Sequence, residues 1–326
     1  MQTPGLPRRL LRAILRDEDN VNLIDSTPLA FMHLAALVGL FLVPFAWAAL
    51  AVAAILYVVR VFALTAGYHR YFSHRAFRTS RAFQFLLAFV GGTSAQLGPL
   101  WWAAHHRHHH RFADTEQDIH SPAWRGLFWS HLGWLLCRKY SRTELDLVPD
   151  LAKFPELRFL DRWHALPPLM LLVSLFGLGE WAATARPGWG LTGGNLVVYG
   201  FFLSTVLVYH ATFCINSLTH VIGRRRFATA DESRNSLLLA LITMGEGWHN
   251  NHHRYPVATR QGFYWWEIDL TYGILRALSW VGLVWDLRPV PAKIYEEARQ
   301  AAPGQEAEPA DAGPVTLPLG SAPESA

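Results

Sequence analysis

The sequence predicts an all-α integral membrane protein, in which four transmembrane helices carry a helical cap on the cytoplasmic side. Three observations support this fold class. Hydrophobic residues make up 51% of the 326 residues, with 14 Trp and 19 Phe among them, which is typical of a polytopic membrane protein. Several apolar runs approach the ~20 residues that a membrane-spanning helix needs. The histidines, in contrast, gather in the polar segments beside these runs.

Residues 1–26 are expected to form a basic cytoplasmic segment. Its apolar residues share one side of a short helix over positions 10–15, beside several arginines, a pattern that suits the membrane surface. No long apolar stretch precedes Asp17, so we do not expect a cleavable signal peptide. At the other end, residues 300–326 are rich in Ala, Pro and Glu and are expected to form a disordered tail.

A single membrane domain is expected over residues 27–299. The apolar runs place its four spans at about 27–45, 47–66, 166–185 and 196–215. The first two spans form a tight helical hairpin, and a turn rich in Gly and Pro joins the other two. Arg60 falls near the end of the second span, and its long side chain is expected to extend to the lipid headgroups.

The charge distribution predicts the orientation in the membrane. The polar region between the second and third spans is rich in Arg and Lys, whereas the turns on the other side hold almost none. The positive-inside rule therefore puts this region and both chain termini in the cytoplasm. The net charge of +4 is modest, and the basic residues flank apolar segments, so we do not expect nucleic acid as a partner. Cys137 and Cys214 are too few for a disulfide framework or a cysteine-based metal site.

Histidine spacing predicts a metal centre in the cytoplasmic layer. Residues at i, i+3 and i+4 share one face of a helix, and the HxxHH pattern with this spacing occurs twice. Together with histidines that follow the second and fourth spans, nine imidazoles are available. One divalent ion takes roughly four to six ligands, so the number predicts two ions. Spacing does not choose between iron, zinc, copper and nickel.

The central run HHRHHH can be read in two registers. His106, His109 and His110 spell HxxHH, and so do His105, His108 and His109. The two sets occupy helix faces that differ by one residue, and spacing alone does not decide between them.

A family resemblance rests on five segments that occur in a fixed order: LTAGYHRYFSHRAF, HHRHHHRFADTEQDIHSP, WSHLGWLLCRKY, NSLTH and GEGWHNNHHRYP. They resemble segments of the membrane fatty acid desaturases, most of all the stearoyl-CoA (delta-9) enzymes, from about Ala30 to Lys293. The family places Arg directly after the first central ligand, as in His106–Arg107, which selects the later register. The resemblance implies two iron ions, which zinc can replace in a purified sample, held by nine ligands: His69, His74, His106, His109, His110, His220, His249, His252 and His253.

The same resemblance assigns supporting residues. Asn216 is similar to a residue that reaches a metal through water, and Asp118 and His120 are similar to an acidic-x-His pair behind the ligands. No catalytic residue beyond the metal centre is implied. Residues similar to substrate contacts are Trp102, Thr212 and Phe213 at the bend of an acyl tunnel, and Arg138 and Lys139 at the CoA headgroup.

The implied reaction is the O2-dependent introduction of a cis double bond, at delta-9, into a saturated long-chain acyl-CoA. A separate ferredoxin or cytochrome b5-type protein with its reductase is expected to supply electrons, because the sequence has no Rossmann-type glycine motif, HPGG-like haem segment or cysteine cluster. The sequence departs from the animal enzymes at Ala104 and His105, where they carry an Arg–Asp pair that contacts CoA. This departure favours an acyl-lipid substrate as an alternative.

Two more functions are compatible with a histidine-rich membrane protein. A membrane hydroxylase of fatty acyl chains or alkanes differs only after the first hydrogen abstraction, which ligand spacing does not determine. A metal transporter would need polar ligands inside the spans, where His33 and His210 are the only clear candidates and are expected to be isolated.

Overall fold

The computed structural model describes residues 26–300, so residues 1–25 of the predicted N-terminal segment and 301–326 of the predicted tail lie outside the described residues, whereas Gln300 ends helix α15. Within this range the chain is mostly helical, as predicted. The elements are α2 (Thr27–Leu42), α3 (Trp47–Phe62), η2 (Ala63–Ser73), β1 (Arg78–Thr79), α4 (Arg81–Gly92), α5 (Pro99–Phe112), α6 (Pro122–His131), η3 (Gly133–Leu136), η4 (Arg138–Tyr140), η5 (Leu145–Leu147), α7 (Pro149–Ala152), α8 (Pro155–Arg162), α9 (Leu166–Ala185), η6 (Pro187–Trp189), α10 (Gly193–Asn195), η7 (Leu196–Leu203), α11 (Ser204–Ser217), η8 (Leu218–His220), α12 (Leu237–Ile242), α13 (His249–Arg254), α14 (Leu270–Trp280), β2 (Val284–Trp285) and α15 (Ala292–Gln300).

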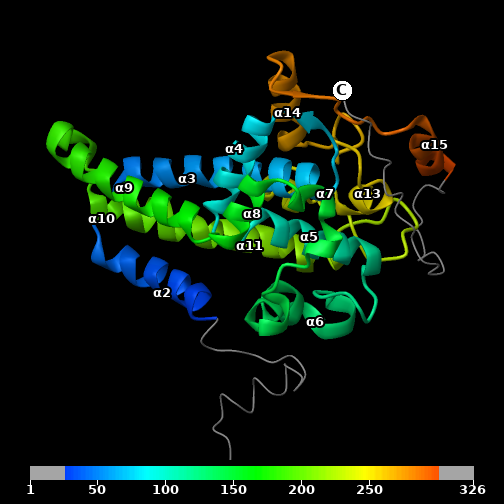
Figure 1. The fold of residues 1–326 in the computed structure, drawn as a ribbon, viewed down its shortest axis with the longest axis horizontal. Helices are drawn as coiled ribbons and strands as arrows, with labels where there is room; N and C mark the ends of the chain where they lie inside the picture. The colour runs from blue at the N-terminus through cyan, green and yellow to red at the C-terminus, as the bar shows by residue number, and fades with distance from the viewer. Residues whose placement is uncertain (1–25, 301–326) are drawn as a thin grey trace, which may run out of the picture.

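Long apolar helices run alongside one another through the molecule (Figure 1). α3, α9 and η7 pack around one apolar core, which includes Ala53, Leu175 and Phe201. α5, α7 and α13 gather toward the end of the bundle that lies away from α10. The two strands pair antiparallel, Arg78 with Trp285 and Thr79 with Val284, which ties the C-terminal region to the segment after η2. The histidine-bearing segments therefore meet at one end of the bundle.

Three helices of the described residues are long and apolar enough to span a membrane: Trp47–Ser73, Leu166–Ala185 and Pro187–His220. The third predicted span coincides with α9. The second and fourth predicted spans lie inside longer helices, because each helix continues past its apolar run into a histidine segment. The first predicted span corresponds to α2, whose 16 residues are fewer than the ~20 that a span needs.

The helix that begins with α3 ends in a π-helix, η2, which carries the first histidine motif. Its i→i+5 hydrogen bonding brings residues five apart closer to one side of the helix than the winding of an α-helix does. The His74 amide donates a hydrogen bond to the His69 carbonyl at 3.3 Å. The π-helical winding therefore turns His69 and His74 the same way, and their ring centres lie 4.9 Å apart.

Arg60 does not extend to the headgroups, so that expectation is wrong. Its side chain is only 1% exposed and donates hydrogen bonds to Ser204, to Thr205 Oγ1 at 2.7 Å and to the Thr93 carbonyl at 3.3 Å. Two hydroxyls in the first turn of α11 thus solvate the guanidinium inside the bundle, which removes the need to reach water.

Helix α5, which carries the central histidines, is fixed at its N-terminus by Asp161. One carboxylate oxygen accepts hydrogen bonds from the amides of Leu100 and Trp101, at 3.0 and 2.9 Å. These amides have no partner within the helix, and a negative charge there also opposes the helix dipole. Gly98 permits this approach, because a Cβ at its position would lie 2.2 Å from Asp161 Oδ1. This contact sets the direction in which α5 carries its histidines.

Candidate metal centre

The nine histidines named by the sequence fall into two adjacent clusters. In each cluster the imidazole nitrogens lie within 4.8 Å of one another. The first cluster contains His69, His74, His106, His110 and His252, and the second contains His109, His220, His249 and His253. α5 contributes to both clusters, and so does α13. The fold therefore brings together all nine side chains, and their role as ligands stays a prediction.

The Nε2 atoms point at one another within each cluster. In the first, Nε2 of His252 lies 3.0 Å from Nε2 of His69 and 2.8 Å from Nε2 of His110. In the second, the Nε2 atoms of His220 and His249 are 3.2 Å apart. Such convergence is the arrangement that a shared metal ion requires.

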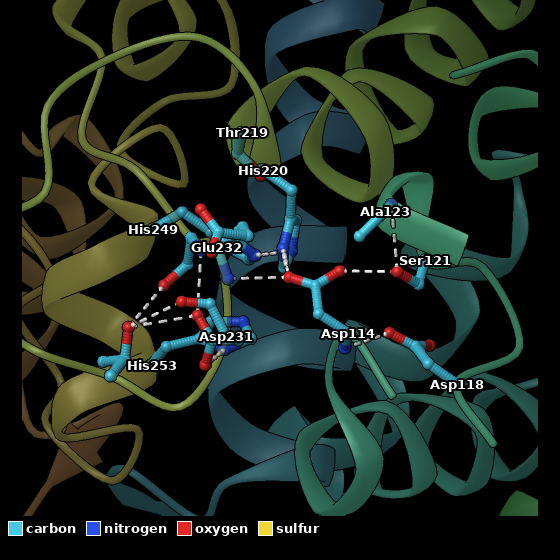
Figure 2. Close-up of polar contacts among 12 residues, drawn as sticks. Asp114, Asp118, Ser121, Ala123, Thr219, His220, Asp231, Glu232, His249 and His253 are labelled. Atoms are coloured by element: carbon cyan, nitrogen blue, oxygen red, sulfur yellow. Dashed lines mark hydrogen bonds and ion pairs between the residues drawn. The ribbon is translucent and has the colours of Figure 1, made fainter. Parts of the chain in front are cut away.

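Buried carboxylates hold the opposite nitrogen of three rings in the second cluster. Figure 2 shows two of these rings, His220 with Asp114 and His253 with Asp231. Nδ1 of His220 donates to Asp114 at 2.7 Å, and Nδ1 of His253 donates to Asp231 at 2.9 Å. Nδ1 of His109 donates to Asp118 at 3.0 Å. A carboxylate behind a histidine fixes the tautomer and the orientation of the ring.

The first cluster has its own support. Glu246 forms an ion-pair contact with Nδ1 of His69. The Gln261 side-chain amide lies 3.3 Å from Nδ1 of both His69 and His252. These groups approach the rings from the side away from the other histidines, so they orient the first cluster as the aspartates orient the second.

The surroundings favour the charged form of the carboxylates and the neutral form of six of the nine rings, whereas Asp114 raises the pKa of His220 despite its burial. Burial and neighbouring imidazoles hold the pKa of His106, His110 and His252 well below the ordinary range. Burial raises the pKa of Asp114, but His220 and hydrogen bonds outweigh this effect and lower the pKa to about 2. Despite its burial, His253 likewise keeps the pKa of Asp231 well below its usual value. Metal ligation needs the neutral form of histidine.

This donor set fits a metal ion. Because His109, His220 and His253 each donate their Nδ1 proton to a carboxylate, each Nε2 carries a lone pair. Nε2 of His253 has no hydrogen-bond partner within residues 26–300. Lone pairs held close together in a dry interior repel one another unless a cation lies between them. Nitrogen ligands of this kind suit iron, zinc, copper or nickel.

The predicted supporting residues lie beside the clusters. Asp118 contacts His109 directly, whereas its nearest oxygen is 3.9 Å from Nδ1 of His120. Burial lowers the pKa of His120 to about 3. Asn216, on α11, lines a small cavity together with histidines of both clusters.

The alternative register places two histidines outside both clusters. Nδ1 of His105 lies 2.9 Å from the Trp101 carbonyl, and the ring packs on Trp101 with centres 4.3 Å apart. Nε2 of His108 lies 2.9 Å from the Gln117 carbonyl. One ring nitrogen of each of these histidines is thus in contact with a backbone carbonyl of its own region.

A cavity of about 560 Å³ leads from the clusters into the bundle, between α2, α9 and α11. Four of the five predicted substrate contacts line it: Trp102, Arg138, Thr212 and Phe213. Lys139 does not line it, and its ammonium lies 5.2 Å from the centre of the Tyr140 ring. The volume falls within the range of ligand-binding cavities, roughly 300–1,000 Å³.

Comparison with known proteins decides the family. A family model described as fatty acid desaturase matches residues 28–283. The chain belongs to the fatty acid desaturase family. The resemblance in the histidine segments is therefore confirmed, and this desaturase is an oxidoreductase of a membrane-bound family.

Its relatives act on two kinds of acyl carrier. It is 34% identical to an sn-1 stearoyl-lipid 9-desaturase of Anabaena variabilis over 82% of this chain and 94% of that protein. It is 35% identical to an acyl-CoA 5-desaturase of Anemone leveillei, over 77% of this chain and 75% of that protein. It is also 35% identical to a delta-9 acyl-lipid desaturase of Arabidopsis thaliana, over 79% of this chain and 80% of that protein.

Sequence reasoning missed four groups of this desaturase that contact the histidines: Asp114, Asp231, Glu246 and Gln261. Two of them carried a local signal. Asp114 follows the central motif closely, and Glu246 stands three residues before His249. Asp231 and Gln261 lie in segments without a histidine pattern, so only the fold reveals their role.

The central register can be tested by metal analysis of purified variants. His106→Ala and His110→Ala should lose bound metal and activity, because each removes a ring from the first cluster. His105→Ala and His108→Ala should retain both. His109 belongs to both registers and cannot distinguish them. The later register is wrong if His105 and His108 prove necessary for metal binding while His106 and His110 do not.

The role of the buried aspartates can be tested with Asp231→Asn. The amide keeps the shape of the side chain but weakens the charged contact with His253, so we expect metal affinity to fall ~10–100-fold. Competition with a chelator measures this change. Asp286→Asn serves as the matched control, because its pair with Arg78, at 3.3 Å, is exposed. Equal metal retention in the two variants would remove Asp231 from the support of the centre.

Proposed function

We propose that this desaturase introduces a cis double bond at the delta-9 position of a saturated long-chain acyl-CoA. The observation that supports this best is that two neighbouring cavities share four lining residues. The small cavity between the clusters and the large cavity are both lined by Trp102, His106, Thr212 and Asn216. An acyl chain in the large cavity can therefore present its methylenes to both histidine clusters, so the position of the chain selects the C–H bonds that react.

We infer that two iron ions are held by the nine histidines, with Asn216 reaching one of them through water. When bound, the iron pair supplies the activation of O2 that removes two hydrogens from adjacent methylenes. The chain itself orients the rings, and burial favours the neutral form of most of them. Apolar side chains of the small cavity, including Val61, Leu64 and Ile215, exclude water from the reacting carbons.

The carrier of the acyl group is proposed from the cationic end of the large cavity. Arg138 lines this cavity, and Lys139 follows it in η4. Both side chains are exposed and suit a phosphate-bearing headgroup such as that of CoA. A membrane lipid is the second candidate, favoured by the departure at Ala104 and His105 and by the acyl-lipid desaturases among the relatives.

The membrane arrangement follows the charge pattern. We propose that α2 is the first of four spans in a membrane domain over residues 27–299. Both termini and the metal centre then face the cytoplasm. A ferredoxin or cytochrome b5-type protein with its reductase would deliver electrons there.

Lipid analysis of a host that expresses the chain tests the proposed reaction. We expect new cis-monoenes, with double bonds that mass spectrometry locates at delta-9. The His106→Ala variant provides the matched control and should leave the host profile unchanged. Hydroxy acids in place of monoenes would instead identify a hydroxylase.

The acyl carrier can be tested by replacing both cations, Arg138→Gln with Lys139→Gln. Hydrogen bonds to charged groups contribute ~1.5–3 kcal/mol, so KM for acyl-CoA should rise roughly tenfold or more. The value of kcat should change little, because the headgroup lies away from the reacting carbons. Arg142→Gln, in the same segment but outside the cavity wall, is the control. Unchanged acyl-CoA kinetics, with direct desaturation of phospholipid acyl chains, would replace acyl-CoA by membrane lipid as the substrate.

A further inference from the structure

Three histidines outside the metal centre form a chain of contacts across three helices. His33 lies on α2, His210 on α11 and His131 at the end of α6. Nε2 of His33 is 3.2 Å from Nε2 of His210, and Nδ1 of His210 is 2.9 Å from Nε2 of His131. The expectation that His33 and His210 are isolated is therefore wrong, because the fold places α2 against α11.

Helix α2 is attached differently along its two halves. In its C-terminal half, Gly39 packs so closely on η7 that a Cβ would lie 2.8 Å from Val198 Cγ2. Its N-terminal half instead forms a wall of the large cavity, through Pro28, Leu29, Phe31 and Met32. His33, in this half, supplies the polar contact with α11. The C-terminal half is thus closely packed on η7, whereas the N-terminal half covers a cavity and contacts the bundle at its edge through Met32 and Phe31.

The histidine chain also contacts the opposite wall of the cavity. The His131 ring meets the Phe213 ring edge-on, with centres 5.6 Å apart, and the His33 ring centre is 6.2 Å from that of Tyr209. Tyr209 and Phe213 line the cavity. Within residues 26–300, no carboxylate, lysine or arginine forms a hydrogen bond or ion pair with the three rings.

The hydrogen-bond donors in this series of contacts are fewer than the contacts themselves. It begins at the Leu29 carbonyl, 2.8 Å from Nδ1 of His33, and ends at the Phe213 carbonyl, which accepts from Ser217 Oγ at 2.7 Å. His131 Nδ1 lies 2.9 Å from Ser217 Oγ. Three neutral rings and one hydroxyl supply four protons to five contacts. One of the five contacts therefore lacks a proton while the rings are neutral and is not a hydrogen bond. The chain of contacts is correspondingly weaker and easier to separate.

We propose that the N-terminal half of α2 is a hinged wall of the acyl cavity, that His33, His210 and His131 form its latch, and that the acyl chain enters sideways through this wall. The inference rests on the proposed function of the cavity. The outer side chain of this half, Leu34, is 59% exposed, so the outer surface of the wall suits an apolar phase. A saturated acyl chain in the bilayer, attached to a membrane lipid or to CoA, is the ligand.

The latch can be tested without measuring activity. Met32→Cys places a reporter thiol on the cavity side of α2, after Cys137→Ala and Cys214→Ala remove the native thiols. In phosphatidylcholine nanodiscs, a lipid-soluble maleimide should label this thiol at least fivefold faster when His210→Leu is added. His210→Gln, which keeps a hydrogen-bonding group, should restore slow labelling. Equal rates in all three proteins, with equal metal content, would overturn the latch.

Entry through the wall can be tested by a reversible cross-link. Phe31 of α2 faces Phe202 of η7, with ring centres 5.8 Å apart, so a short bis-methanethiosulfonate should join Phe31→Cys to Phe202→Cys in the same cysteine-free background. The matched control joins Phe45→Cys to Tyr199→Cys, whose rings are 6.2 Å apart and lie outside the cavity lining. The cross-linked wall should lose at least tenfold in turnover, and a reductant should restore it.

A loading experiment separates entry from chemistry. Enzyme that is cross-linked after it has taken up substrate without O2 should complete one turnover when O2 and electrons are added, and no second turnover. Stearoyl-CoA and stearoyl phosphatidylcholine are tested in parallel, and loss with either supports the wall and identifies the carrier that uses it. Unchanged turnover with both carriers in the cross-linked enzyme would overturn it. Absence of double bonds even in the reduced, uncross-linked protein would instead contradict the proposed function.

Discussion

The structure depends on holding the lone pairs of neutral imidazoles toward two points in a dry interior. This arrangement is unfavourable without a cation, because the lone pairs repel and water is excluded. It is maintained by carboxylates behind the rings: Asp114, Asp118, Asp231 and Glu246. Each carboxylate is itself costly to bury unless it is paired. Rings and carboxylates therefore stabilise one another, and a metal ion held by the proposed ligands would couple its binding to the folding of the centre.

A buried arginine extends this dependence to the surrounding elements. Arg70, on η2, donates hydrogen bonds to Glu246 at 3.0 Å and to Asp269 at 3.1 Å. Asp269 in turn accepts from the backbone amide of Gln261 at 2.8 Å, which holds the Gln261 side chain beside His69. The Arg70 guanidinium thus links the first histidine motif to the segments before and after α13. This link positions the two halves of the chain relative to each other at the centre.

The sequence predicted the histidines of the centre better than the residues and helix geometry that hold them in place. Imidazoles at helical spacing are rare enough to be recognised, and α9 is a mostly apolar run of 20 residues. Three features could be recognised only from the folded structure. The π-helical winding that aligns His69 with His74 leaves no mark in the spacing, and Arg60 found hydroxyl partners on a helix distant in sequence. Asp231 is one of 25 acidic residues, and no pattern separates it from the others.

The two kinds of histidine cluster in this protein differ in the hydrogen-bond partners of their ring nitrogens. In the candidate metal centre, a carboxylate accepts a hydrogen bond from Nδ1–H of His220 or His253, which directs the Nε2 lone pair of the neutral ring at neighbouring histidines. In the chain formed by His33, His210 and His131, the rings instead contact one another through both nitrogens of His210 and end on neutral groups. The two nitrogens of one ring cannot bind the same ion, so this arrangement does not assemble three ligands around a metal. Neutral partners also leave the contacts weaker than charge-assisted ones. The same side chain can therefore form a permanent centre where carboxylates support it and a contact that can open where they do not.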